Sequence, residues 1–214
     1  MNSEKLVAKN LLDIKAVFLN VKEPFTWASG IKSPIYCDNR LTLSDVNVRH
    51  NVEQALADII KNHYPECEMV MGTATAGIAH AAIVSDILKL PMGYVRASAK
   101  SHGRTNQIEG KCEKGTKVVV IEDLISTAGS SLEVVDVLKE NGIEVLGIAS
   151  IFSYGMKKAF DRLRDANVIN HSITNLDILL EVAIENNYIT KDEQTNIIKF
   201  RNNPSDESWI GGTK

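Results

Sequence analysis

Residues 118–130 read VVVIEDLISTAGS, in which four apolar residues precede two acids, two more apolar residues and a small hydroxyl-rich segment. An unbroken apolar run such as VVVI is typical of a strand that is buried on both faces of a parallel sheet. The hydroxyl residues and glycine that follow suit a turn from strand to helix, where free backbone N–H groups and the helix dipole attract an anion. The segment therefore predicts a buried strand that leads into an anion site.

Strand-like and helix-like patterns alternate on both sides of this segment. Apolar runs predict strands over residues 68–72, 92–96, 117–121, 143–152 and 168–173, and helical patterns over 77–88, 131–141 and 156–165 lie between them. Alternation of strand and helix predicts an α/β fold, a parallel sheet with helices on both faces. Gly142 is a suitable cap for the helix over 131–141.

The N-terminal part follows a different pattern. Helical spacing of Val7, Leu11, Ile14 and Phe18 predicts a first helix with Ser3 as its cap, and a second helix is expected from about Ser44. Residues 24–40 are rich in turn formers and aromatic residues, and residues 201–214 are expected to form a polar surface tail. We expect one domain over residues 1–214, in which 1–42 form a small hood and about 66–175 form the α/β core.

The composition excludes several classes of protein. Twenty-four Lys and Arg against 27 Asp and Glu give a formal charge of −3, which does not suit a protein that coats nucleic acid. Cys37, Cys67 and Cys112 form no CxxC pair, so a disulfide scaffold or structural zinc site is not expected. Charges interrupt the apolar residues of the first 15 positions, so we expect this stretch to be neither a signal peptide nor a membrane anchor. We expect a cytoplasmic protein with no membrane or nucleic-acid partner.

Glu122 and Asp123 stand directly before the hydroxyl-rich residues 126–130, which we call the hydroxyl loop. The chain contains neither GxxxxGK[ST] nor GxGxxG, so the standard nucleotide loops are absent. Two carboxylates would repel a triphosphate, but they suit the paired hydroxyls of a ribose whose 5-phosphate lies in the hydroxyl loop, or a divalent ion. The alternative is that both acids are ordinary strand-end residues and that the loop only caps a helix.

A second candidate lies in residues 96–104, which read RASAKSHGR and which we call the basic segment. Arg96, Lys100, His102 and Arg104 supply four cationic or potentially cationic groups with almost no apolar anchor. Taken alone, such a segment is better explained as a solvated charged loop. Next to a sugar-phosphate site, it suits a lid that closes over a departing polyanion and excludes water.

These motifs together resemble a known enzyme family. The pattern over 118–130 resembles the phosphoribosyl-pyrophosphate (PRPP) signature of type I phosphoribosyltransferases. The order Arg96, Lys100, His102-Gly103, and the segment FTWASGIKSPIYCDNR over 25–40, resemble the orotate phosphoribosyltransferase family. Residues 72–77, GTATAG, look like that family's pyrophosphate-contacting turn. The similarity extends over nearly the whole chain.

The resemblance implies a type I phosphoribosyltransferase fold and transfer of the 5-phosphoribosyl group from PRPP to orotate, which gives orotidine 5′-monophosphate and pyrophosphate. It also implies Mg²⁺, bridged through PRPP without a direct protein ligand, with Asp123 in contact through water. A homodimer follows as well, because in the family the lid lysine reaches the neighbouring subunit's site.

The resemblance also assigns roles to individual residues. Lys100 is expected to be catalytic, with His102 and Arg96 beside it on the pyrophosphate, while Glu122 and Asp123 hold the ribose hydroxyls. The remaining PRPP-binding positions are the two apolar residues and the hydroxyl loop: Leu124, Ile125, Ser126, Thr127, Ala128, Gly129 and Ser130. Orotate is expected to meet Ser126, Ile35 and Tyr36.

This chain departs from the family pattern at several positions. Ala28, Ala76 and Ala97 stand where many members have a basic residue, and Ala128 stands where glycine is common. If the loop requires a positive φ at Ala128, the backbone there is strained.

Two rival functions remain at this stage. A purine or uracil phosphoribosyltransferase would share the acidic pair and the hydroxyl loop, but residues 25–40 and the Lys-x-His-Gly motif argue against it. A regulator that binds PRPP or a nucleotide without catalysis is the rival from another class, and turnover would distinguish it.

Overall fold

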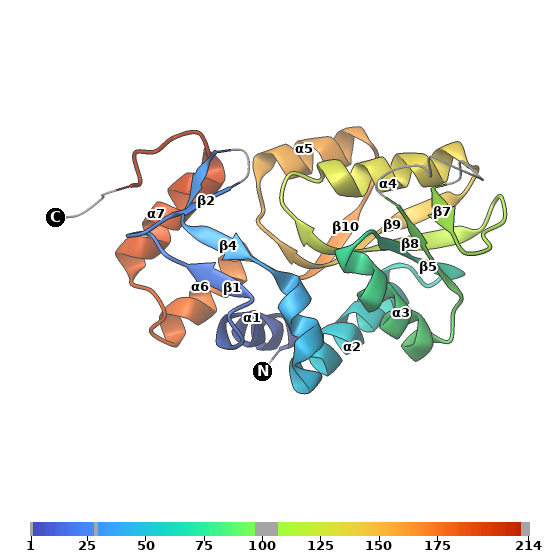
Figure 1. The fold of residues 1–214 in the computed structure, drawn as a ribbon, viewed down its shortest axis with the longest axis horizontal. Helices are drawn as coiled ribbons and strands as arrows, with labels where there is room; N and C mark the ends of the chain where they lie inside the picture. The colour runs from blue at the N-terminus through green and yellow to red at the C-terminus, as the bar shows by residue number, and fades with distance from the viewer. Residues whose placement is uncertain (1, 28–29, 97–106, 211–214) are drawn as a thin grey trace.

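A six-stranded sheet lies at the centre of the computed structural model, which describes residues 2–27, 30–96 and 107–210 (Figure 1). Its strands are β5 (Met69–Thr73), β6 (Met92–Val95), β7 (Ile108–Glu109), β8 (Lys117–Ile125), β9 (Glu144–Ser153) and β10 (Asn170–Asn175). They lie in the order β10-β9-β8-β5-β6-β7, and all neighbours are parallel except β7, which is antiparallel to β6. The predicted parallel sheet is confirmed; the two-residue strand β7 carries too short a pattern to have been predicted.

Helices cover both faces of this sheet. In Figure 1, α2 (Val46–His63) and α3 (Ala76–Leu88) lie below it, and α4 (Gly129–Glu140) and α5 (Lys157–Asp165) lie above. Side chains of β8 alternate between two apolar cores: Val119 and Ile121 enter the core on the α2–α3 side, and Val118 and Val120 enter the other. All four side chains are fully buried. This double burial is the reason why the strand reads as an unbroken apolar run.

The two ends of the described chain come together beside the sheet. This lobe contains α1 (Ser3–Asp13), β1 (Val17–Leu19), β2 (Phe25–Thr26), β3 (Lys32–Ser33), β4 (Ile35–Cys37), the 3₁₀ helix η1 (Asn39–Ser44), α6 (Leu176–Glu185) and α7 (Lys191–Asn202) (Figure 1). β1 pairs with β4, and β2 pairs with β3, both antiparallel. From here on, the hood is the part of this lobe that runs from β1 to η1, including the connections between its strands. None of the described helices is both long and apolar enough to cross a bilayer.

The polar segment predicted from residue 201 to lie on the surface is mostly exposed where the structure describes it, but it is anchored at two points. α7 continues to Asn202, and Trp209 is only 1% exposed. The Trp209 ring packs edge-on against Phe200 at a centroid distance of 5.7 Å, and Phe200 packs in the same way against Trp27 at 5.5 Å. A tryptophan in either place is expected to pack, but a single tryptophan among polar residues gives no periodic pattern, so the sequence could not reveal which rings it contacts.

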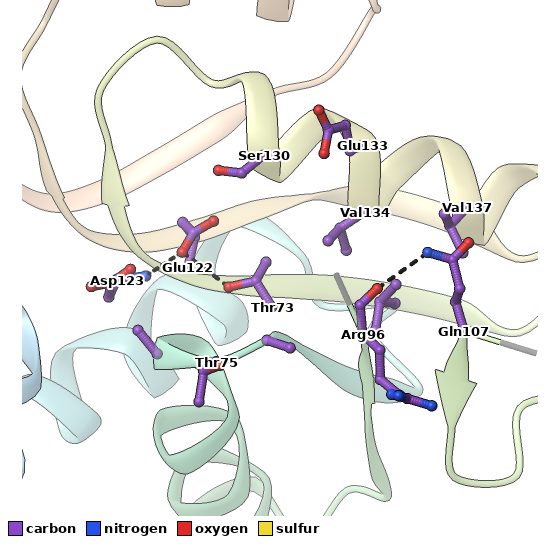
Figure 2. Close-up of a pocket in the computed structure, with 13 residues that line it drawn as sticks. Thr73, Thr75, Arg96, Gln107, Glu122, Asp123, Ser130, Glu133, Val134 and Val137 are labelled. Atoms are coloured by element: carbon purple, nitrogen blue, oxygen red, sulfur yellow. Dashed lines mark hydrogen bonds between the residues drawn. The ribbon is translucent and has the colours of Figure 1, made fainter. Parts of the chain in front are cut away.

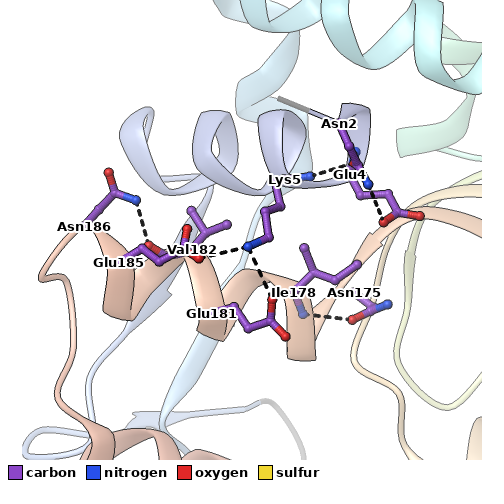
Figure 3. A network of polar contacts seen from close by, with 9 residues as sticks. All are labelled: Asn2, Glu4, Lys5, Asn175, Ile178, Glu181, Val182, Glu185 and Asn186. Carbon is purple, nitrogen blue, oxygen red and sulfur yellow. Dashed lines mark hydrogen bonds and ion pairs between the residues drawn. The ribbon is translucent and has the colours of Figure 1, made fainter.

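The first helix also differs from its prediction. Asn2, not Ser3, caps α1, because its side chain accepts hydrogen bonds from the backbone N–H groups of Glu4 and Lys5 (Figure 3). The helix ends at Asp13, and Phe18 lies in β1 with 41% of its surface exposed. Figure 3 shows Lys5 between Glu181 and Glu185 of α6, at Nζ–O distances of 3.5 and 2.9 Å. These ion pairs are exposed and contribute little to stability.

Candidate active site

The sheet order places a crevice at the carboxyl ends of β5 and β8. After β5 the next strand in the chain, β6, is added on one side of β5, whereas β8 and the strands that follow it are added on the other side. Ligands of open α/β sheets bind where the strand order reverses in this way. A cavity of about 270 Å³ opens there (Figure 2). Its polar lining consists of Thr73, Thr75, Arg96, Gln107, Glu122, Asp123, Ser130 and Glu133.

Glu122 lies inside β8, not after it, because the strand continues through Leu124 to Ile125. Only 5% of its surface is exposed, and its two oxygens accept hydrogen bonds from the hydroxyls of Thr73 and Ser131, both at 2.9 Å. Figure 2 shows Thr73 on the neighbouring strand pointing at this carboxyl group. Burial, reinforced by the nearby Asp123, raises the pKa of Glu122 to about 7. The carboxyl group therefore keeps its proton to a higher pH than an exposed glutamate does.

Asp123 is partly exposed and lies between two cavities. Together with Thr75 and Ala76 it lines both the crevice and a second cavity of about 490 Å³, which Cys37, Asp38 and Arg40 of the hood complete. A ligand that spans both cavities must therefore pass the Asp123 carboxylate.

Asn39 of the hood is hydrogen-bonded to Asp123. Its side chain is fully buried, donates from Nδ2 to the backbone carbonyl of Asp123 at 2.6 Å, and accepts from the Cys37 thiol at 3.3 Å. Burial raises the pKa of that thiol well above its usual range. The sequence analysis placed Thr73 in the pyrophosphate turn but missed its bond to Glu122, and it assigned no role to Asn39 or Ser131 individually. These contacts depend on which strands and helices become neighbours.

The hydroxyl loop connects β8 to α4. Ala128 has φ 58° and ψ 15° in the left-handed region, so the strain expected at this position is present. Thr127 is held from outside by Arg162 of α5, whose Nη1 donates to the Thr127 carbonyl at 3.1 Å and to its hydroxyl at 3.3 Å. The Ile125 side chain is 1% exposed and packs in the core, so only its backbone faces outward. Leu124 is partly buried against the other core.

The turn after β5 brings α3 close to the acidic pair. A Cβ atom on Gly77 would lie 2.4 Å from the Ile121 carbonyl oxygen and 2.6 Å from the Thr73 hydroxyl. Only glycine therefore allows this approach of α3 to β8. The Ala74–Thr75 peptide bond in the turn is cis. Residues 73–76, expected to contact pyrophosphate, all line the crevice.

Arg96 is the one residue of the basic segment that the structure describes. It follows β6 and lines the crevice, and its backbone N–H donates to the Gln107 carbonyl at an N–O distance of 2.9 Å. Lys100 and His102 lie outside the described residues, as do Ala97 and Ala28.

The two hood residues expected to meet orotate differ in exposure. The Ile35 side chain is fully buried, so the structure offers only its backbone to a ligand. Tyr36 is 43% exposed, and its ring contacts Phe25 at 5.6 Å.

Comparison with known proteins identifies the family. Residues 43–188 match the phosphoribosyl transferase domain. The chain is 57% identical to an orotate phosphoribosyltransferase of Listeria innocua, over 98% of this chain and 99% of the relative. The chain belongs to the orotate phosphoribosyltransferase family.

Solved structures agree with this membership. The orotate phosphoribosyltransferase of Aeropyrum pernix is 30% identical, with a TM-score of 0.74 over 86% of this chain and 99% of that one. The UMP synthase of Leishmania donovani is 26% identical, with a TM-score of 0.78 over 92% of this chain and 42% of the longer protein. The type I phosphoribosyltransferase fold expected from the sequence is thus confirmed.

Proposed function

We propose that this chain transfers the 5-phosphoribosyl group from PRPP to orotate, giving orotidine 5′-monophosphate and pyrophosphate in pyrimidine nucleotide synthesis in the cytoplasm. The observation that carries the proposal is the acidic pair between two cavities at the ends of β5 and β8, in a chain 57% identical to an orotate phosphoribosyltransferase. One cavity has the turn of residues 73–76 and Arg96 for pyrophosphate, and the other has the hood for the base.

The acidic pair would hold the ribose in our proposal. Asp123 faces both cavities and accepts from the two ribose hydroxyls, while Glu122 is fixed from behind by Thr73 and Ser131. Because the pKa of Glu122 is about 7, hydroxyl donors or a cation at this point would favour its ionised form.

The hydroxyl loop would bind the 5-phosphate. Ser126 and Ser130 bring hydroxyl donors, and residues 127–129 contribute backbone N–H groups at the start of α4, where the helix dipole favours an anion. Ser126 would also meet the orotate carboxylate, with Tyr36 and the Ile35 backbone on the base.

The basic segment would stabilise the leaving group. Lys100 is the catalytic residue in this proposal, and His102 and Arg96 assist it on pyrophosphate. No protein nucleophile is needed, because positioning of the two substrates and neutralisation of the departing charge lower the barrier.

The crevice fits Mg²⁺ held mainly by its substrate. No group of three or more acidic, histidine or cysteine ligands occurs among the described residues. Asp123 would contact the ion through water, which suits a cation that keeps several waters. When bound, Mg²⁺ supplies charge neutralisation for pyrophosphate and the ribose oxygens.

A homodimer that exchanges its basic segments completes the proposal. Mixed dimers test it: Lys100→Ala and Asp123→Asn chains, each impaired alone, should regain activity on mixing, because one site of the mixed dimer then has both residues. Lack of recovery in dimers that are shown to have exchanged subunits would exclude a shared lid.

The activity itself is tested by following orotate absorbance with PRPP and Mg²⁺, in parallel with uracil, adenine, hypoxanthine and xanthine. Consumption of orotate alone is expected. Turnover of another base would overturn the substrate while keeping the PRPP site, and PRPP binding without turnover would favour the regulator.

A further inference from the structure

A separate cavity of about 490 Å³ lies between α5, the hood and the segment after α7. Its walls include Trp27 and Ile31 of the hood, Lys158 and Arg162 of α5, and Arg201 and Pro204. Thr127 also lines it, so the cavity adjoins the hydroxyl loop. Among the described residues, none of its lining is shared with the two cavities at the acidic pair. A space of this size accommodates a small organic ligand.

The charges of this cavity favour an anion. Both of its acids already have cationic partners: Asp161 pairs with Lys157 and Arg164, and Asp165 pairs with Arg164. Lys158 forms no ion pair within the described part of the chain, and Arg162 uses only Nη1, in its bonds to Thr127. An anion could therefore meet Lys158 and the other N–H groups of Arg162 without breaking an existing ion pair.

Another part of the cavity lining is apolar and aromatic. The Trp27 ring is fixed by Tyr154, at a centroid distance of 6.1 Å and an interplanar angle of 30°, and by the edge of Phe200. Ile31, Met156 and Pro204 add apolar surface around it. A rigid indole beside aliphatic side chains suits a flat ring.

We propose that this cavity is a second ligand site, which takes a phosphate-bearing molecule with a flat ring, of the nucleoside monophosphate class. The phosphate lies against Lys158 and Arg162, and the ring lies against Trp27. Binding there acts on the catalytic cavity through Arg162, because the same guanidinium holds the Thr127 carbonyl in the hydroxyl loop. A phosphate that draws the Arg162 guanidinium towards itself lengthens the bond to Thr127, loosens the loop and raises the KM for PRPP.

Equilibrium dialysis with uridine 5′-monophosphate tests the site. Because the nucleotide is also expected to enter the catalytic cavity, the quantity to measure is the number of nucleotides bound per chain. This number is compared between two variants that carry the same Lys-to-Glu charge reversal at different places. Lys158→Glu should bind one equivalent fewer than the wild type, whereas Lys61→Glu, at an exposed lysine of α2, should bind as the wild type does. Neither lysine belongs to the catalytic cavity, so turnover and the KM for PRPP without nucleotide should stay within twofold.

Two further probes separate the parts of the ligand. Uridine should not bind at this cavity, and inorganic phosphate should bind at least tenfold more weakly than the nucleotide. Equal stoichiometry in Lys158→Glu and Lys61→Glu would overturn the proposal. Inorganic phosphate that binds as tightly as the nucleotide would overturn the role of Trp27 and the flat ring.

Discussion

Replacing Glu122 by glutamine should change how stability depends on pH. Glutamine keeps the shape of the side chain, and its amide oxygen can still accept from Thr73 while its amide nitrogen donates to the Ser131 hydroxyl. The wild-type carboxyl group has its pKa raised from 4.5 to about 7, chiefly by burial. The folded protein therefore binds this proton more tightly than the unfolded chain does, and stability falls as pH rises from about 4.5 to about 7.

The magnitude follows from the two pKa values. One pKa unit corresponds to about 1.4 kcal/mol, so ionised Glu122 destabilises the folded state by about 3 kcal/mol in full. Between pH 5 and pH 8 about 2 kcal/mol of this is expressed. E122Q should match the wild type at pH 5 and exceed its free energy of unfolding by about that amount at pH 8.

Urea unfolding at pH 5, 6, 7 and 8 measures this difference. Glu133→Gln is the matched control, because Glu133 lines the same crevice but is exposed, and its curve should run parallel to the wild type. E122Q should at the same time lose turnover, because glutamine lacks the carboxylate that holds the ribose. The wild-type carboxylate would then be a group that serves the substrate and lowers the stability of the fold. A free energy of unfolding for E122Q that parallels the wild type from pH 5 to pH 8 would refute the reasoning.

Three other substitutions address the rest of the proposed machinery. Lys100→Ala should lower kcat by about 100-fold or more with an unchanged melting temperature, because the loss concerns the leaving group; near-normal turnover would remove Lys100 from the mechanism. Asp123→Asn should weaken PRPP binding in a direct titration, and unchanged affinity would contradict its ribose role. Asn39→Ala should lower the free energy of unfolding by about 1–3 kcal/mol, because it leaves the buried Asp123 carbonyl without its donor. It should also raise the KM for PRPP, and an unchanged KM would limit Asn39 to a structural role.

The core of the fold could be predicted because its signals are local. The run Val118–Ile121 is apolar since both faces of β8 are covered, and Gly142, with φ 78°, ends α4 as expected. The sequence placed the end of β8 four residues too early, because two acids interrupt the apolar run although Ile125 still pairs with Ser153.

The site could be predicted only where its residues adjoin in the chain. Glu122, Asp123 and the hydroxyl loop form one continuous motif, and Ala128 has the positive φ that its place in the motif suggested. Asn39 lies 84 residues from Asp123, and Arg162 lies 35 residues from Thr127. Such contacts follow from the packing of whole elements, which no local pattern encodes.

The ring contacts of Trp27, Phe200 and Trp209 also bear on how the chain is made. During synthesis the N-terminal end emerges first, and domains usually begin to fold in that order. Here Trp27 must wait for its partners until Phe200 and Trp209 have been synthesised, more than 170 residues after it. The sheet can pair its strands before that moment. Emergence of Phe200 and Trp209, rather than strand pairing, would then time the completion of the packing around Trp27.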